Sequence, residues 1–161
     1  MNRARKTALV AAACAALAAP AEGLRRTVYY DPPGIPTVCF GHTGTDVNPD
    51  KVYSLVECKA LLDADMTRAM EAVDACRPGL PDSVLVAFAD AVFNMGPTIA
   101  CNTAKSTAAR LLASGDYAAA CRQLPRWNKA RVAGIAVELP GLTRRRKAEM
   151  GYCLSGIVDG G

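Results

Sequence analysis

The stretch EGLRRTVYYDPPGIPTVCFGH, which runs from Glu22 to His42, decides the fold. It places one acid, Glu22, nine residues before a second, Asp31, with a threonine and the only histidine close behind. Carboxylates at this spacing cannot share one face of a helix. β-Branched and aromatic residues between positions 27 and 40 surround the run DPPG, and this pattern predicts a short antiparallel ribbon with a tight turn.

Two carboxylates in unlike surroundings, facing across a cleft, are what glycoside hydrolysis requires. Glu22 stands where a first helix should end, and apolar residues nearby would favour the protonated form of a general acid. Asp31 lies in the polar turn, where an ionised carboxylate could activate water or stabilise positive charge at the sugar. Thr37, on the returning strand, could hydrogen-bond that water. The spacing leaves an alternative open, in which Glu22 is a solvated helix-end charge and Asp31 an ordinary turn former.

The composition is that of one globular domain. The chain has 161 residues, of which 51% are hydrophobic and 21% charged, so it can bury a core and lacks the signature of disorder. The formal net charge of +4 suits an anionic partner such as a bacterial cell wall, a membrane surface or a nucleic acid, without selecting one of them.

The cysteines indicate disulfides in an oxidising compartment. No C-x-x-C pair occurs and the lone His42 cannot complete a familiar zinc site, so no metal is expected. Six cysteines could form three bridges and leave one over. The seven cysteines are Cys14, Cys39, Cys58, Cys76, Cys101, Cys121 and Cys153.

The N-terminus resembles an export signal. Arg3, Arg5 and Lys6 precede the apolar run Ala8–Ala19, and the sequence APA at 19–21 resembles a cleavage site. The run is shorter than the ~20 apolar residues that span a bilayer. A plain amphipathic or buried first helix is the alternative.

The rest of the chain predicts helices. Ser54 and Glu57 form a capping box before a long helix that should end near Arg77. Gly- and Pro-containing stretches separate the further segments. The other predicted helices cover residues 82–94, 104–113, 116–124 and 143–154. One small ribbon followed by many short helices predicts the α+β class, as a single domain over residues 1–161 with an N-terminal helix in 1–21.

The opening motif resembles the catalytic signature of phage-type lysozymes, glycoside hydrolase family 24: an acid, eight residues, an Asp, five residues and a Thr. Further stretches are similar to the endolysin branch of that family, and together they cover about residues 20 to 155. They are TVCFGHTG (37–44), ECKALL (57–62), FNMG (93–96), and Gly141-Leu142 with Arg145, Arg146 and Glu149.

This resemblance implies a lysozyme-like fold with the ribbon beside the active-site cleft. It also implies hydrolysis of the β-1,4 bond between N-acetylmuramic acid and N-acetylglucosamine in peptidoglycan, with inversion. Glu22 is then the general acid, and Asp31 and Thr37 position and activate the water. The expected enzyme is a monomer without cofactor or nucleic-acid partner, exported to the periplasm or cell wall of the bacterial host.

The family fold brings three cysteine pairs together, so the expected bridges are Cys39–Cys58, Cys76–Cys101 and Cys121–Cys153. The family pattern also implies a structural ion pair between His42 and Asp65. Some endolysins keep a weakly hydrophobic signal-arrest-release segment, and we expect residues 1–21 to be retained here with transient membrane contact. Cys14, the odd cysteine, would then either exchange disulfides or simply pack in that helix.

Four other features have a functional and a structural reading. Trp127 could stack on a sugar, but a core position is favoured. The run Arg144–Lys147 could bind nucleic acid, but a solvated helix face with some affinity for the wall is favoured. Asn94 and Gly96 either line the cleft or simply end a helix.

Three other functions compete with the hydrolase. A lytic transglycosylase uses one acid and no water, so Asp31 argues against it. The intact set of Glu22, Asp31 and Thr37 disfavours a catalytically inactive peptidoglycan-binding module. A nucleic-acid-binding helical domain ranks last.

Overall fold

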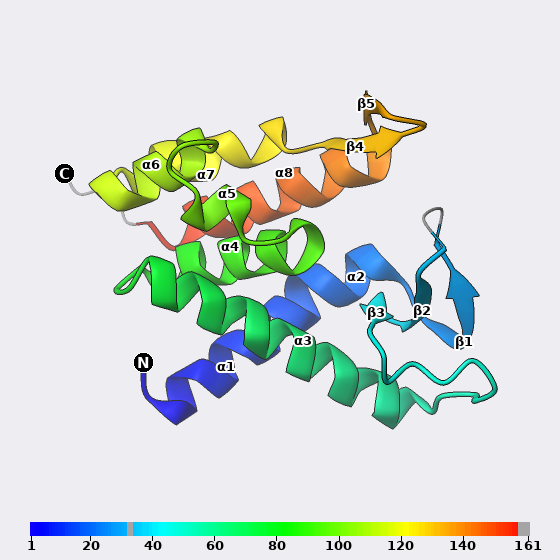
Figure 1. Cartoon of the computed structure of the whole chain (residues 1–161). Helices are drawn as coiled ribbons and strands as arrows, with labels where there is room; N and C mark the ends of the chain where they lie inside the picture. Colours follow the sequence, from blue (N-terminus) through cyan, green and yellow to red (C-terminus); the bar gives the residue numbers. More distant parts are fainter. Residues whose placement is uncertain (32–33, 158–161) are drawn as a thin grey trace.

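The computed structural model describes residues 1–31 and 34–157, so Pro32 and Pro33 of the predicted turn lie outside the described residues. The chain is mostly helical, with two small antiparallel sheets at one end of the helical body (Figure 1). This is the predicted α+β class. The helices are α1 (Arg3–Ala13), η1 (Cys14–Ala18), α2 (Ala19–Glu22), α3 (Leu55–Cys76), α4 (Asp82–Met95), α5 (Thr98–Cys101), α6 (Thr107–Ser114), α7 (Tyr117–Gln123), η2 (Leu124–Arg126) and α8 (Pro140–Ser155). The strands are β1 (Arg25–Tyr30), β2 (Pro36–Cys39), β3 (His42–Thr43), β4 (Lys129–Val132) and β5 (Ile135–Glu138).

Helix α4 forms the centre of the core because its sequence is apolar on every side. All residues from Val84 to Val92 are buried, as expected of a helix that is hydrophobic all round. Helices α1, α3 and α8 pack against it. Asp90 is the one charged side chain in this buried run, and a buried carboxylate needs a cation or a hydrogen-bond donor as its partner.

The N-terminal helix is longer than the predicted Ala8–Ala19 helix. Helical backbone continues from Arg3 to Glu22 through α1, η1 and α2. η1 is a π-helical turn that ends two residues before Pro20, whose missing N–H cannot bond the carbonyl of Ala16. The buried side chains of this segment join the core beside α3 and α4. They are Leu9, Val10, Ala13, Cys14, Leu17 and Ala18.

Within the described chain, the segment Arg3–Glu22 is the one helix long and apolar enough to cross a membrane. A buried core helix and an N-terminal signal sequence meet the same criterion. In this conformation the segment is packed as the first helix of the domain.

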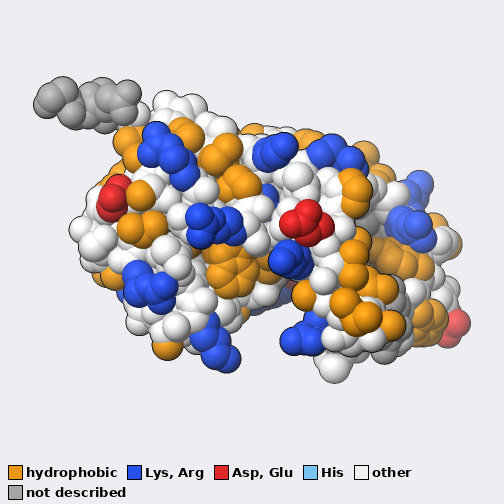
Figure 2. All heavy atoms as spheres, turned by 90° about the horizontal axis from the view of Figure 1, so that it is seen from above, with side chains coloured by type: hydrophobic (Ala, Val, Ile, Leu, Met, Phe, Trp, Pro, Cys, Tyr) orange, Lys and Arg blue, Asp and Glu red, His pale blue; other side chains and the backbone are white. Residues whose placement is uncertain are grey.

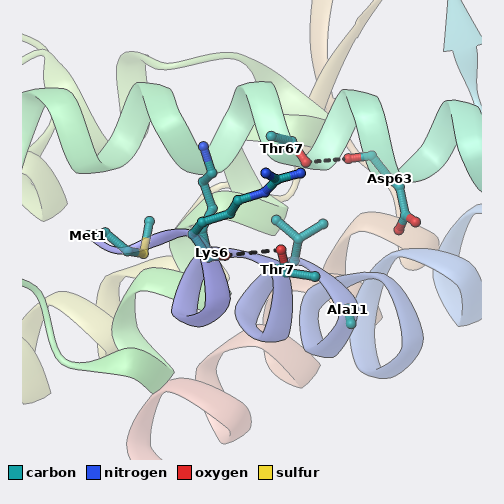
Figure 3. Close-up of a pocket in the computed structure, with 8 residues that line it drawn as sticks. Met1, Lys6, Thr7, Ala11, Asp63 and Thr67 are labelled. Atoms are coloured by element: carbon teal, nitrogen blue, oxygen red, sulfur yellow. Dashed lines mark hydrogen bonds between the residues drawn. The ribbon is translucent and has the colours of Figure 1, made fainter.

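Two ion pairs fix the basic end of α1 to the body. Arg5 pairs with Asp82 at the start of α4, and Lys6 pairs with Glu71 on α3. Such exposed pairs contribute little stability each, about 0–1 kcal/mol. Beside Lys6, a pocket of 470 Å³ opens between α1 and α3 (Figure 3). Its lining also includes Met1, Thr7, Ala11, Asp63 and Thr67.

The ribbon is a three-stranded antiparallel sheet in the order β1–β2–β3. Tyr29 pairs with Thr37, and Thr37 pairs in turn with Thr43. The register shifts between Arg25 and Tyr29, so β1 contains an irregularity of the kind that bends a strand. β1 begins three residues after Glu22, and β2 and β3 pack against α3.

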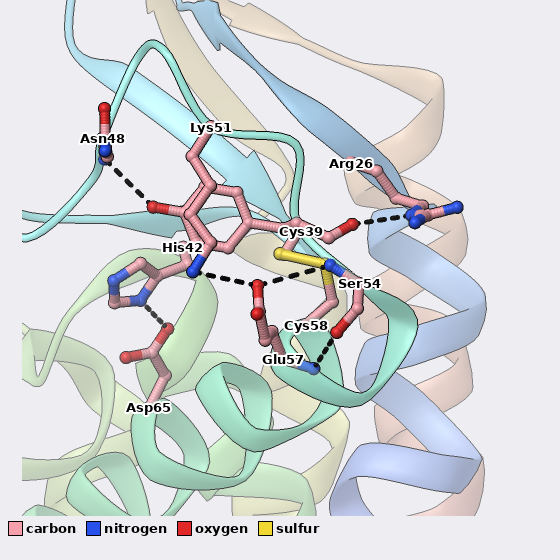
Figure 4. Close-up of a disulfide and its surroundings, with 10 residues drawn as sticks. Arg26, Cys39, His42, Asn48, Lys51, Ser54, Glu57, Cys58 and Asp65 are labelled. Atoms are coloured by element: carbon pink, nitrogen blue, oxygen red, sulfur yellow. Dashed lines mark hydrogen bonds and ion pairs between the residues drawn. A yellow bond between two sulfur atoms is a disulfide. The ribbon is translucent and has the colours of Figure 1, made fainter.

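Three disulfides join the same pairs that were expected: Cys39–Cys58, Cys76–Cys101 and Cys121–Cys153. The first ties β2 to the start of α3, directly beside the capping box of that helix (Figure 4). By closing a loop in the unfolded chain, each bridge contributes roughly 2–4 kcal/mol. The ribbon is therefore covalently fixed to the helical body.

Cys14 is the free cysteine. It is buried, and its thiol faces the carbonyl of Leu62 on α3. Burial, reinforced by the nearby charge of Asp63, raises the pKa of this thiol to about 12. Because the thiolate is the reactive form, Cys14 is a packing residue in this conformation.

Two predictions differ from the structure. The helix expected over residues 104–113 begins three residues later, as α6, because the Ser106 hydroxyl accepts the N–H of Ala109 and caps the helix there. The stretch around Gly134 contains a second hairpin, β4–β5, where a loop was expected. Its turn residues Ala133 and Gly134 both have positive φ, as a two-residue hairpin turn requires.

Candidate active site

Glu22 is the last residue of α2, and Gly23, with a φ of 67°, turns the chain out of the helix into β1. The Glu22 side chain is 21% exposed. Its Oε1 accepts a hydrogen bond from Nη1 of Arg145 on α8. Glu22 therefore stands where the first helical segment, the ribbon and α8 meet. The sequence did not reveal the guanidinium that lies against this carboxylate.

The Glu22 carboxylate also lies directly against the backbone of Gly41, in the turn between β2 and β3. A Cβ added at Gly41 would be 2.8 Å from Oε2 of Glu22, and the φ of Gly41 is +78°. Only glycine tolerates both conditions at no cost. The space that the Glu22 carboxylate occupies therefore explains the glycine of the GH pair at 41–42.

Replacing Gly41 with alanine is expected to lower activity about a hundredfold, since a 1 Å misplacement of a catalytic group has an effect of that size. The positive φ alone destabilises the fold by about 1–2 kcal/mol. Gly79→Ala is the matched control, because Gly79 has a φ of +81° and nothing within 4 Å of an added Cβ. Gly41→Ala carries both the backbone strain and the clash with Glu22, whereas Gly79→Ala carries only the strain. Rates of cell-wall lysis and melting temperatures of both variants therefore distinguish the two effects. Equal activities in the two variants would contradict this reading of Gly41.

Arg145 is held in place by Asp90 of α4. Its Nε and Nη2 donate to the two carboxylate oxygens of Asp90 over 3.0 and 2.9 Å, and its guanidinium carbon lies 5.6 Å from the centre of the Phe93 ring. Burial opposes the charge of Arg145, but Asp90 and Glu22 raise its pKa. The cation therefore stays charged and presents its remaining edge to Glu22.

The predicted solvated face at Arg144–Lys147 was wrong for two of its four residues. Arg145 and Arg146 are buried, whereas Arg144 and Lys147 are exposed. The run spans more than one helix face, and α8 packs on α4 so that two of its arginines point into the core. Buried carboxylates there provide partners for both guanidiniums.

Asp31 and Thr37 both bond to Ile35 at the end of the ribbon hairpin. The Asp31 Oδ1 accepts the backbone N–H of Ile35 over 2.8 Å, and the Thr37 hydroxyl donates to the Ile35 carbonyl over 3.1 Å. Thr37 is buried. The structure thus brings these two predicted residues together on the ribbon, while Glu22 contacts Gly41 and Arg145.

A pocket of 350 Å³ lies between the ribbon and helices α3 and α4. Gly41, whose backbone the Glu22 carboxylate contacts, is one of its lining residues. Polar side chains and an aromatic ring, the usual surroundings of a sugar, line it. Its lining includes Gly41, Thr43, Asp65, Arg68, Phe93 and Gly96. Of Asn94 and Gly96, which were expected at a cleft or a helix end, Gly96 lines this pocket and also ends α4. Trp127 packs, partly buried, against the core, as favoured.

His42 links the ribbon to α3. Its Nδ1 lies 2.7 Å from Asp65, the predicted partner (Figure 4). Its Nε2 lies 3.0 Å from Asp46, which the sequence interpretation missed. Burial opposes protonation, but the hydrogen bonds with Asp65 and Asp46 outweigh it and raise the pKa of His42. The bond to His42 lowers the pKa of Asp46 in turn. The imidazolium therefore bridges two carboxylates.

This bridge predicts a pH-dependent stability. Because the pKa of His42 is higher in the folded than in the unfolded chain, protonation of His42 stabilises the fold. This stabilisation is complete when the pH is below the unfolded pKa of about 6.5, and it is lost as the pH rises through the folded pKa. The gain from Asp46 is present above about pH 4 and disappears as the pH falls further. The wild-type protein should therefore melt at a higher temperature than His42→Gln, with the largest difference near pH 5–6. That difference should be roughly 2–4 °C larger than the difference at pH 9.

Asp46→Asn should reduce that pH-dependent advantage, whereas Asp50→Asn, at an exposed aspartate nearby, should leave it unchanged. An advantage over His42→Gln that stays constant from pH 5 to pH 9 would refute the bridge.

Asp90 is the site residue that sequence reasoning missed completely. A signal was present, because it is the single acid within the apolar run VLVAFADAVF of α4. A buried carboxylate needs a partner, and the cations that could supply one are in the C-terminal motif of α8.

Comparisons with known proteins agree with this geometry. Residues 19–149 match the family described as phage lysozyme. A SAR-endolysin of Bacteriophage PS119 is 39% identical over 136 residues, covering 84% of this chain and 77% of the relative. A SAR-endolysin of Pseudomonas phage phiKMV is 35% identical over 155 residues, covering 96% of this chain and 93% of that relative. Among solved structures, the active form of the P1 phage endolysin Lyz shares the fold, with a TM-score of 0.76 at 23% identity over 98% of this chain and 96% of that one.

Proposed function

Because the chain belongs to the phage lysozyme family, we propose that it hydrolyses the β-1,4 bond between N-acetylmuramic acid and N-acetylglucosamine. It is a glycoside hydrolase of the endolysin type, which acts on bacterial cell walls. The observation that carries the finer proposal is the position of Glu22. Its carboxylate is held between Arg145 and Gly41, and Gly41 lines the pocket between the ribbon and helices α3 and α4.

In the proposed reaction, Glu22 donates a proton to the leaving oxygen of the scissile bond. Asp31 and Thr37 position the attacking water and activate it, giving inversion at the anomeric carbon. The Thr37 hydroxyl donates its hydrogen to the Ile35 carbonyl, so its oxygen is free to accept a hydrogen bond from the water. The bond from Ile35 to Asp31 fixes that carboxylate on the same side of the hairpin.

The surface charge supports an anionic polymer as the substrate. Figure 2 shows a face of the molecule over which Lys and Arg side chains are spread among few acidic ones. Helices α6, α7 and α8, with η2 and β4, expose many of the basic residues. They include Arg110, Arg122, Arg126, Lys129, Arg131, Arg144 and Lys147.

The proposal extends to the N-terminus. We infer that the segment Arg3–Glu22 directs export, contacts the membrane transiently and is retained, so that the enzyme acts in the periplasm as a single-domain monomer. The length and apolar character of the segment and the names of the SAR-endolysin relatives support this inference. Its packing against α3 and α4 explains why it would be kept after export.

Product analysis tests the reaction. Purified peptidoglycan is digested, and the glycan ends are identified by mass spectrometry and by their anomeric configuration in NMR. Hydrolysis with inversion predicts reducing muramic acid ends that appear first as the α-anomer. Anhydro sugar ends would establish a lytic transglycosylase instead. An intact polymer, with the protein bound to it, would establish an inactive binding module.

A further inference from the structure

One corner of the molecule exposes apolar side chains that no described element covers. The start of β1, the segment 51–53 and the first turn of α3 form this corner (Figure 1). Val52 is 65% exposed there and Val56 78%, so each presents most of its surface to solvent. Leu24 and Leu55 are also exposed. These four residues are called the apolar corner.

The segments of the corner are fixed to one another. Thr27 of β1 pairs with Val52 in an antiparallel bridge. The Arg26 guanidinium donates to the carbonyl of Tyr53 over 2.6 Å (Figure 4), and the disulfide between β2 and α3 lies beside them. None of these contacts involves the segment Arg3–Glu22, so they do not depend on where that segment lies.

Basic side chains surround the apolar corner. Each is a neighbour of a corner residue, either along the chain or one turn away on α3. Two acids, Asp50 and Glu57, lie among them, and Glu57 is paired with Lys51 over 3.2 Å. Four basic and two acidic side chains leave a net charge of +2. Apolar side chains within a basic rim are typical of a surface that lies on an anionic bilayer. The four basic residues, all exposed, are Arg25, Arg26, Lys51 and Lys59.

The path of the chain brings this corner close to any membrane that the N-terminal segment enters. The segment Arg3–Glu22 is long and apolar enough to cross a bilayer, and Leu24 comes two residues after its end. A fully extended chain covers at most about 3.6 Å per residue. Leu24 is therefore within about 7 Å of the end of an inserted segment, and Thr27 within about 18 Å. Val52 accompanies Thr27, because the two residues pair.

We propose that the apolar corner is a membrane-docking surface, with which the domain rests on the anionic phospholipids of the bilayer that its N-terminal segment contacts. The four apolar side chains enter the boundary between headgroups and acyl chains, and the basic rim contacts lipid phosphates. No residue of the corner lines the pocket beside Gly41, so docking leaves the proposed active site open to the cell wall. This inference rests on the proposed membrane contact of the segment Arg3–Glu22.

Co-sedimentation of the full chain with lipid vesicles tests the proposal. The wild-type protein should bind vesicles that contain phosphatidylglycerol better than vesicles of phosphatidylcholine alone, and the difference should shrink as salt screens the charges. The double variant Val52→Ser, Val56→Ser should bind roughly tenfold more weakly, since binding scales with buried apolar area. The double variant Arg25→Gln, Lys59→Gln should lose about twentyfold on the anionic vesicles, because each cation contributes roughly fivefold there.

The double variant Val132→Ser, Ile135→Ser is the matched control. These residues are 52% and 67% exposed on the β4–β5 hairpin, outside the corner, so this variant should bind vesicles as the wild type does. Every variant keeps the N-terminal segment. Equal vesicle binding by the corner variants and the wild type would therefore assign the whole contact to that segment and overturn the proposal.

A second measurement separates the membrane from the substrate. On purified cell walls free of lipid, the Val52→Ser, Val56→Ser variant should bind and lyse at wild-type rates. A weaker affinity of this variant for the walls would assign the corner to the glycan and overturn the proposal. Failure of the proposed role of the N-terminal segment has a different sign, which is its removal during export, seen by mass spectrometry of the mature enzyme whatever the vesicles give.

Discussion

Glu22→Gln should abolish lysis of cell walls and leave the protein folded. The amide keeps the shape of the side chain, and its oxygen can still accept the bond from Arg145 that the carboxylate accepts. It has no proton to donate to the leaving sugar. General acid catalysis contributes roughly 10²–10⁴-fold to such reactions, so turnover should fall by about a thousandfold. Initial rates on purified cell walls, with a melting curve for the same sample, measure both effects.

Glu138→Gln is the matched control. Glu138 is exposed on β5, so the same chemical change there should leave lysis close to wild type. A soluble, folded Glu22→Gln protein with near-normal turnover would show that another group supplies the proton.

Removing residues 1–21 should also eliminate activity, this time by disrupting the fold. Burial of Leu9, Val10 and Leu17 stabilises the protein by about 1.5–3 kcal/mol for each side chain, and their sum approaches the whole stability of a typical domain, about 5–15 kcal/mol. The truncated chain would also begin at Glu22 with a charged amine beside the acid, and this favours the carboxylate form. Loss of the cooperative melting transition together with loss of lysis is the expected result.

A chain lacking only residues 1–2, which precede α1, should behave as the full chain does. Mass spectrometry of active, exported enzyme provides an independent check. A mature protein that begins at Glu22 and still lyses cells would show that the first helix is dispensable.

Much of the secondary structure could be predicted from the sequence because it depends on local patterns of residues. The Ser54–Glu57 capping box begins α3 as expected, and the alternating residues around the DPPG turn form the ribbon. The three disulfide pairs followed from the family resemblance, since spacing alone leaves about fifteen pairings open. The β4–β5 hairpin was missed because an Ala-Gly turn lacks the asparagine or aspartate that usually marks such turns.

The site was predicted less completely, because its charges meet across long distances in the sequence. Glu22 and Arg145 are 123 residues apart, and periodicity cannot show that Arg145 points into the core. Asp46 was overlooked for a different reason. It lies four residues from His42 in an irregular loop, and its contact needs Gly44, where an added Cβ would be 2.7 Å from the Asp46 carboxylate.

The positions of the disulfides determine what the first helix can do. Each bridge closes a covalent ring, and the rings enclose residues 39–58, 76–101 and 121–153. The segment Arg3–Glu22 lies outside all three, and its one cysteine is free. Movement of this segment away from α3 and α4 would therefore break no disulfide.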